Sequence, residues 1–169
     1  MRILILLIFL VSNSYANEVK EIKNLIINKE LKKYDSITLI DDKGKLIDLS
    51  EYNGNLILLN FWATWCAPCK EEMPSLDKLQ IHKKLNNLKI FPVNVGKDNL
   101  EKSLNFYNVL GIKNLKVYFD TDITLAKKFG LRGIPTSILL NKDGYEFARI
   151  IGSIDYEDIK FIDWLSNYN

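Results

Sequence analysis

Two cysteines, Cys66 and Cys69, constrain this chain more than any other feature of its sequence. They follow residues 56–61, a run that is apolar except for Asn60 and that predicts a central strand covered on both faces. Residues 68–85 then favour a helix, so the cysteine pair lies where a buried strand passes into a helix. The chain has no other cysteine, and a pair three positions apart cannot hold distant parts of a fold together. These cysteines therefore serve chemistry or bind a metal.

The rest of the pattern alternates short strands with helices, as expected of one α/β domain in a chain of 169 residues. A hairpin is predicted around Gly44, which can take the positive φ of a turn, and a second one around Gly144. The predicted strands are 36–40, 45–49, 56–61, 89–95, 117–119, 137–140 and 147–151, and the predicted helices are 68–85, 100–110, 123–129 and 156–165.

The N-terminus has the pattern of an export signal. Arg2 precedes an apolar run over residues 3–11, and Ser14 and Ala16 are the small residues that a signal peptidase requires. This pattern predicts that residues 1–16 are a signal peptide, cleaved after Ala16, and that the mature protein is periplasmic. The alternative is an uncleaved membrane anchor, although the run is far shorter than the roughly 20 residues of a spanning helix.

Residues 17–35 are predicted to lead into a domain formed by residues 36–169. The apolar residues Val19, Ile22, Leu25 and Ile26 are separated by polar ones at intervals that favour an amphipathic helix over residues 17–33.

The charge of the chain excludes some classes of partner. The formal net charge is +2, and removal of residues 1–16 takes away one arginine, with the remaining Lys and Arg residues spread along the chain. Such a distribution has no basic patch that would indicate binding to nucleic acid or to a membrane surface.

The position of the cysteines predicts dithiol chemistry. A sulfur at the start of a helix lies beside unpaired N–H groups and the positive end of the helix dipole, which favour the thiolate of Cys66. We expect Cys66 to attack a substrate disulfide and Cys69, one turn further on, to resolve the mixed disulfide. Pro68 lacks an N–H and has a fixed φ, so it can start the helix without losing a hydrogen bond.

Other chemistries fit the sequence less well. Tetrahedral zinc needs four ligands, and His82 is the only histidine, in a predicted helix beside two lysines that indicate a solvated face. A copper-binding chaperone remains an alternative, with Cys66, Cys69, Met73 and His82 as its only available ligands. A peroxidase would carry a proline seven residues before Cys66, where this chain has a leucine.

Residues 60–74 closely resemble the active-site segment of the TlpA/ResA/CcmG group of exported thioredoxin-like proteins. The resemblance extends to residues 133–137, which are similar to the cis-proline loop of that family, and to residues 140–144. It covers about residues 37–165, and residues 100–110 match the extra helix of the group. The resemblance implies a thioredoxin-like α/β fold, with a central mixed β-sheet flanked by helices, an N-terminal β-hairpin and one inserted helix.

The resemblance also implies roles for individual residues. A cis bond before Pro135 would present the backbone of Ile134 to a substrate peptide beside the cysteines. Trp65 and Pro68 would border the same substrate site, whereas Trp62 either walls the site or packs in the core.

Two positions bear on the proton of the resolving thiol. Thioredoxin carries a buried aspartate where this chain has Asn60, which cannot ionise. Glu72 matches the active-site glutamate of the exported reductases and could take and return the proton of Cys69. The alternative for Glu72 is a surface charge on the helix, which is the expected role of Glu71.

The function implied is reduction of client-protein disulfides, of the type used in cytochrome c maturation or copper-centre assembly. No motif for flavin, nicotinamide or haem is present, so the redox-active disulfide Cys66–Cys69 is the only expected redox group. Electrons would come from a membrane thiol carrier, and a monomer is expected. Ala67 and Pro68 alone do not fix the direction of transfer, so a dithiol oxidase is the alternative within the enzymes.

Overall fold

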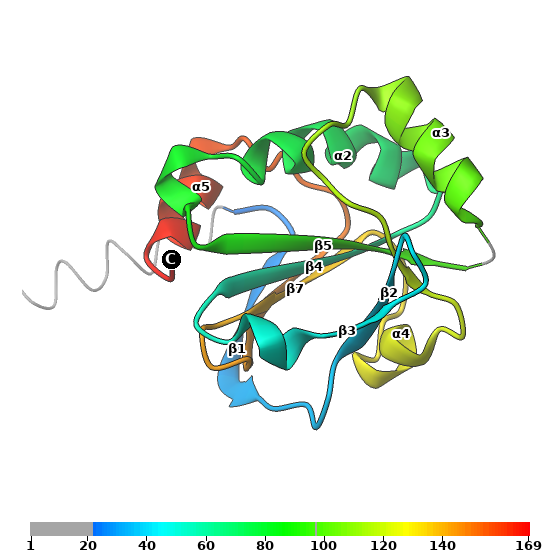
Figure 1. Cartoon of the computed structure of the whole chain (residues 1–169). Coiled ribbons are helices and arrows are strands. Elements are labelled where there is room, and N and C mark those ends of the chain that lie inside the picture. The colour runs from blue at the N-terminus through cyan, green and yellow to red at the C-terminus, as the bar shows by residue number, and fades with distance from the viewer. Residues whose placement is uncertain (1–21, 97) are drawn as a thin grey trace, which may run out of the picture.

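A computed structural model describes residues 22–96 and 98–169, and it contains one mixed sheet with helices on both faces (Figure 1). The strands are β1 (Leu25–Lys32), β2 (Thr38–Asp41), β3 (Leu46–Asp48), β4 (Leu56–Trp62), β5 (Leu88–Val95), β6 (Tyr118–Asp120), β7 (Thr136–Leu140) and β8 (Glu146–Ile151). The helices are α2 (Ala67–Leu79), α3 (Leu100–Leu110), α4 (Thr124–Lys128) and α5 (Ile159–Ser166), with short 3-10 helices η1 (Leu49–Tyr52) and η2 (Lys83–Leu85).

The strand order β1-β8-β7-β4-β5-β6-β2-β3 places β4 near the centre of the sheet. Strand β4 runs parallel to β5 and antiparallel to β7, and every residue in it is buried. Helix α2 connects β4 to β5, and α3 lies between β5 and β6, which are also parallel. This arrangement confirms the predicted thioredoxin-like α/β fold, including the N-terminal hairpin β2–β3 and the inserted helix α3.

The core is divided by the sheet into two apolar layers. Helices α2, α3 and α5 cover one face and α4 the other, as Figure 1 shows. Because side chains alternate along a strand, Leu58 and Trp62 of β4 join the layer that contains Cys69, whereas Leu59 and Phe61 join the opposite layer. By the same alternation Asn60, which is fully buried, faces the cysteine side of the sheet.

The prediction of a helix over residues 17–33 is wrong where the structure tests it. Residues 25–32 form β1, which pairs antiparallel with β8 at the sheet edge. The apolar spacing alone could not distinguish a helix from a strand, and the unpaired N–H and C=O groups of β8 favour the strand. Residues 17–21 and the predicted signal peptide, residues 1–16, lie outside the described residues.

The predicted helix over residues 68–85 is too long. Helix α2 ends at Leu79, and η2 follows after a turn. The His82 Nδ1 atom accepts a hydrogen bond from the Lys84 N–H at 3.3 Å, so this histidine caps η2 and is not on a helix face. In the described part of the chain, no helix has the length and apolar character needed to cross a membrane.

Candidate active site

Cys66 and Cys69 form a disulfide at the N-terminus of α2, with their Cα atoms 5.3 Å apart. Cys66 is the N-cap residue, and its Sγ accepts a hydrogen bond from the Cys69 N–H at 3.3 Å. Pro68 lies in the first turn of the helix, where its missing N–H costs no helical hydrogen bond. Cys66 retains 4% exposure and Cys69 none, so Cys66 is the sulfur that a partner can reach first.

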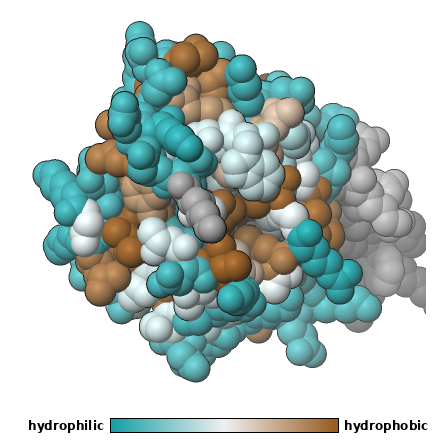
Figure 2. All heavy atoms as spheres, turned by 90° about the vertical axis from the view of Figure 1, so that its right-hand side faces the viewer, coloured by the Kyte–Doolittle hydropathy of each residue, from teal (hydrophilic) through white to brown (hydrophobic). Residues whose placement is uncertain are grey.

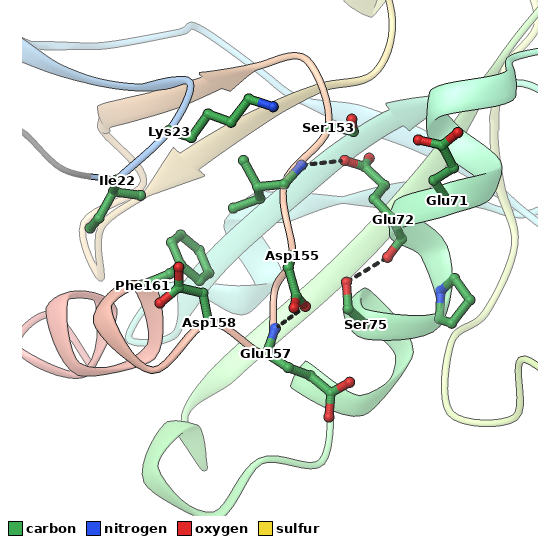
Figure 3. Close-up of a pocket in the computed structure, with 12 residues that line it drawn as sticks. Ile22, Lys23, Glu71, Glu72, Ser75, Ser153, Asp155, Glu157, Asp158 and Phe161 are labelled. Atoms are coloured by element: carbon green, nitrogen blue, oxygen red, sulfur yellow. Dashed lines mark hydrogen bonds between the residues drawn. The ribbon is translucent and has the colours of Figure 1, made fainter.

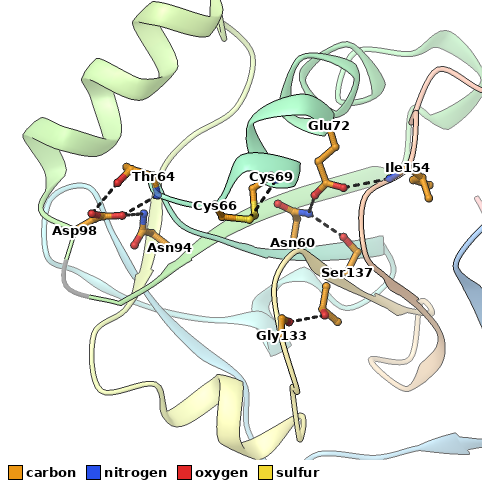
Figure 4. Close-up of a disulfide and its surroundings, with 11 residues drawn as sticks. Asn60, Thr64, Cys66, Cys69, Glu72, Asn94, Asp98, Gly133, Ser137 and Ile154 are labelled. Carbon is orange, nitrogen blue, oxygen red and sulfur yellow. Dashed lines mark hydrogen bonds between the residues drawn. A yellow bond between two sulfur atoms is a disulfide. The ribbon is translucent and has the colours of Figure 1, made fainter.

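The loop before the disulfide is held by Asp98, which precedes α3. The Thr64 backbone N–H and hydroxyl both donate to the Asp98 carboxylate at 2.9 Å, and Asn94 Nδ2 donates to it at 3.2 Å (Figure 4). Burial alone would raise the pKa of Asp98, but these hydrogen bonds lower it. Sequence analysis missed Asp98, although its position after β5, at the same sheet edge as the cysteines, was a usable signal.

The peptide bond between Ile134 and Pro135 is cis, as the resemblance implied. The Gly133 carbonyl in this loop accepts a hydrogen bond from the Thr136 hydroxyl at 2.8 Å. Ile134 also borders an apolar groove of about 440 Å³, to which the 71% exposed side chain of Trp65 contributes. The groove is lined by Trp65, Val95, Ile123, Ala126, Lys127, Leu131, Gly133 and Ile134.

Figure 2 shows the side of the molecule that lies at the right of Figure 1, and apolar side chains gather near the middle of this face with hydrophilic ones around them.

Trp62 takes no part in this surface. It is fully buried, and its ring packs against Phe106 and Tyr107 of α3 with centroid distances of 4.9 and 5.4 Å. Trp62 is therefore a core residue that joins the inserted helix to the sheet.

Glu72, on the second turn of α2, points into the protein and is only 2% exposed. Its Oε1 accepts a hydrogen bond from Asn60 Nδ2 at 2.7 Å, and its Oε2 accepts a long one from the Ile154 N–H at 3.4 Å (Figure 4). Burial raises the pKa of Glu72 to about 8, against the opposing effect of these two hydrogen bonds. Glu71, next to it, is exposed.

Asn60 also joins Glu72 to a buried polar network that the sequence did not reveal. Asn60 Nδ2 donates to the Ser137 hydroxyl at 3.0 Å, and that hydroxyl lies 2.7 Å from the Tyr156 hydroxyl. Tyr156 is fully buried, and its N–H donates to the Ser75 hydroxyl at 3.0 Å. Burial raises the pKa of Tyr156 well above its usual range, and the Glu72 charge adds to this effect.

A pocket of about 630 Å³ lies beside α2 and the segment before α5, and Glu72 is among its lining residues (Figure 3). The Ile154 N–H donates its hydrogen bond to the Glu72 carboxyl group there. Among the described residues, four more carboxylates line the pocket and Lys23 is the one lysine there; these carboxylates belong to Glu71, Asp155, Glu157 and Asp158. The buried carboxyl group thus borders a space that connects it to solvent.

No group of three or more His, Cys, Asp or Glu side chains in residues 22–96 and 98–169 is arranged to hold a metal ion. His82 lies beyond the C-terminal end of α2, whereas Cys66 and Cys69 lie at its N-terminal end. The structure therefore does not bring together the four ligands that a copper chaperone would have used.

Comparison with known proteins gives a consistent result. The Redoxin family model matches residues 18–160. The thiol-disulfide oxidoreductase ResA of Bacillus subtilis is 34% identical over 119 residues, which are 70% of this chain and 65% of ResA. ResA of Geobacillus thermodenitrificans is 35% identical over 124 residues, 72% of this chain and 69% of that protein.

Among solved structures, StoA from Bacillus subtilis superimposes with a TM-score of 0.63 and 25% identity, covering 76% of this chain and 96% of StoA. The region that the Redoxin family model matches includes the strand β4, the disulfide and the cis-proline loop described above. The chain therefore belongs to the Redoxin family and is a homologue of the ResA thiol-disulfide oxidoreductases.

Proposed function

We propose that this protein is a periplasmic thiol:disulfide oxidoreductase that reduces disulfides of client proteins. The observation that carries the proposal is the Cys66–Cys69 disulfide at the N-terminus of α2. The buried carboxyl group of Glu72 lies on the same helix and accepts a hydrogen bond from Asn60. The relatives named thiol-disulfide oxidoreductase support this activity. We further propose clients of the cytochrome c maturation or copper-centre assembly type, and a monomeric protein that needs no cofactor beyond its own disulfide.

The first step uses the reduced protein. The Cys66 thiolate attacks one sulfur of a client disulfide, a new S–S bond forms between protein and client, and the second client sulfur leaves as a thiolate that takes a proton from water. The N–H groups at the start of α2 stabilise the negative charge on Cys66 before the attack.

The second step releases the client. Cys69 loses its proton and attacks the Cys66 sulfur, so that the Cys66–Cys69 disulfide re-forms. The client sulfur leaves as a thiolate and takes a proton from water, which gives the client dithiol. Glu72 takes the proton of Cys69, because its pKa of about 8 lies close to that of a thiol. The acidic pocket gives this carboxyl group a route for proton exchange with solvent. A membrane thiol carrier then supplies two electrons and regenerates the dithiol.

Client recognition is assigned to the groove beside the disulfide. Trp65 and Ile134 line it, Pro68 lies between the two cysteines, and Pro135 follows Ile134 through the cis peptide bond. An extended client segment can pair with the backbone of Ile134 while its apolar side chains enter the groove. The apolar lining favours apolar residues beside the client cysteine.

Two cysteine variants test this mechanism. Cys66→Ser should abolish exchange with a client disulfide, whereas Cys69→Ser should retain the first step and accumulate a stable mixed disulfide. Non-reducing gels and mass spectrometry of the adduct measure both results, and trapping in the native host would identify the client. An adduct with Cys66→Ser and none with Cys69→Ser would reverse the assigned roles.

Two other functions remain to be separated from this one. Reduction of insulin in the presence of a thiol donor, together with metal analysis of the purified protein, distinguishes a reductase from a copper chaperone. A dithiol oxidase would instead start from the Cys66–Cys69 disulfide and oxidise a reduced client, which is the reductase reaction run in the opposite direction. Measurement of the equilibrium with glutathione gives the reduction potential that decides between reductase and oxidase.

Export is part of the proposal. We expect the mature protein to begin at Asn17, after removal of residues 1–16. Mass spectrometry of protein from the periplasmic fraction measures this N-terminus directly. A chain that retains Met1 and sediments with membranes would support the uncleaved anchor instead.

A further inference from the structure

The hydrogen bonds of Asn60 indicate how its side-chain amide is oriented. Its side-chain nitrogen has two protons, and it donates to Glu72 Oε1 at 2.7 Å and to the Ser137 hydroxyl at 3.0 Å. The residue is fully buried on the face of β4 that packs against α2 and the disulfide. With Glu72 ionised, a flipped amide would direct its oxygen at the carboxylate oxygens, and the hydrogen bond to Glu72 would be lost.

The amide oxygen of Asn60 is buried and has no hydrogen-bond partner among the described residues. Such an oxygen is unusual, because an unpaired buried polar group costs about 1–3 kcal/mol. In Figure 4 this oxygen points toward the Cys66–Cys69 disulfide, whereas the nitrogen points toward Glu72. Neither sulfur of a disulfide carries a proton, so the oxidised protein cannot supply the missing donor there.

We propose that Asn60 is a positioning residue whose side-chain oxygen accepts a hydrogen bond from the Cys69 thiol once the disulfide is reduced. Two electrons from a dithiol donor break the S–S bond and, with one proton, leave a Cys66 thiolate and a Cys69 thiol. The new S–H group is the donor that the oxidised state lacks. Asn60 thereby favours the reduced state and keeps the Cys69 proton in place until a mixed disulfide has formed.

The same amide links the thiol to the carboxyl group. Its oxygen contacts Cys69 in the reduced protein, while its nitrogen donates to Glu72 in the oxidised protein. An ionised Glu72 polarises the amide and strengthens its oxygen as an acceptor. This inference rests on the proposed dithiol chemistry, but its test below uses no client and does not depend on exchange activity.

The test is the infrared S–H stretching band of Cys69. In the full-length Cys66→Ser protein Cys69 is the only thiol, because the chain has two cysteines. We expect the band to lie below that of the same protein unfolded in urea, since hydrogen bonding weakens the S–H bond. Asn60→Leu in this background should move the band up to the unfolded position. A band that already lies there with Asn60 present, or that Asn60→Leu leaves unmoved, would overturn the proposal.

Asn94→Leu is the matched control. Asn94 is equally buried and also has an unpartnered side-chain oxygen, but its nitrogen donates to Asp98 and not to Glu72. This variant should leave the Cys69 band in place. If Asn60→Leu does not fold, Asn60→Asp decides, because a carboxyl oxygen differs from an amide oxygen in acceptor strength and should shift the band. An unmoved band in Asn60→Asp would contradict the contact.

A second measurement uses the intact cysteine pair. In the Glu72→Gln background, which removes any effect of the carboxylate charge, Asn60→Leu should lower the equilibrium constant for reduction by dithiothreitol about fivefold, the value of one ordinary hydrogen bond. An unchanged constant would mean that Asn60 has only a structural role. Loss of client exchange with an intact S–H shift would instead count against the proposed function alone.

Discussion

Two glutamates of this protein are almost equally buried, and their surroundings differ completely. Glu146, on β8, is 0% exposed and accepts hydrogen bonds from Arg149 Nε and Nη2 at 2.8 and 2.9 Å. The Tyr34 hydroxyl and Asn28 Nδ2 donate to the same carboxylate. Glu146 therefore has a positive partner and a full set of donors, and these join the segment around β1 to β8.

Glu72 has no such partner. It is 2% exposed, and the groups that donate hydrogen bonds to it, from Asn60 and Ile154, are neutral. No Lys, Arg or His of the described residues forms an ion pair with it. A carboxylate without a counter-ion is costly to bury, which is why its pKa is raised. The comparison separates Glu146, whose charge is fully paired, from Glu72, whose raised pKa fits the proton transfer proposed for it.

The largest effect is expected for Glu146→Gln. This change leaves the Arg149 side chain, which is only 14% exposed, without its counter-ion. Breaking a buried ion pair in this way costs about 3–5 kcal/mol. Urea unfolding of the oxidised protein measures the loss, and the rate of disulfide exchange per folded molecule should not change. A loss below about 1 kcal/mol would remove the distinction between the two glutamates.

Glu72→Gln is expected to have the opposite sign. The pKa of Glu72 is about 8 in the folded protein, higher than its ordinary value of 4.5. The stability that protonated Glu72 contributes to the wild type is therefore complete below pH 4.5 and is lost as the pH rises through 8. The variant lacks this loss and should be more stable than wild type by about 3 kcal/mol at pH 7. The two proteins should converge below pH 4.5. Urea unfolding across pH 4–9 tests this, and parallel pH curves for the two proteins would contradict the raised pKa.

Tyr34→Phe should have the smallest effect. It removes one donor from a carboxylate that keeps Arg149 and Asn28, so we expect a loss of about 1.5–2 kcal/mol, as for a hydrogen bond to a charged group. The thiols should titrate as in wild type, because Tyr34 belongs to the Glu146 cluster. Urea unfolding and thiol alkylation rates measure both expectations, and altered alkylation rates would show that the two clusters are coupled.

The parts of the fold that depend on local sequence were predicted well. The apolar run that became β4, the cysteine pair at the start of α2 and the turn at Gly44 each depend on neighbouring residues. Strand β1 was mistaken for a helix because its conformation depends on β8, more than 100 residues later in the chain. Its contact through Asn28 to Glu146 is likewise long-range and has no signature in a single sequence.

The candidate site shows the same limit. Sequence analysis left Glu72 as either an active-site or a surface carboxylate, because helical spacing alone does not tell which face of α2 is covered. Its burial depends on Ile154, 82 residues later. Ser137 and Tyr156 were missed as members of the network because each lies in a segment that reads as ordinary apolar structure.

The most direct test of the central claim, that Glu72 takes the proton of Cys69, is the rate of the resolving step. Reduced protein treated with 5,5′-dithiobis(2-nitrobenzoate) carries a mixed disulfide at Cys66, and attack by Cys69 releases a coloured thiolate that stopped-flow absorbance measures. In wild type the rate should rise with pH through about 8, as Glu72 ionises. Glu72→Gln should be about a hundredfold slower at pH 8 and should follow only the ionisation of the thiol itself. Identical rates and pH profiles for the two proteins would contradict the assignment of Glu72 as the proton acceptor.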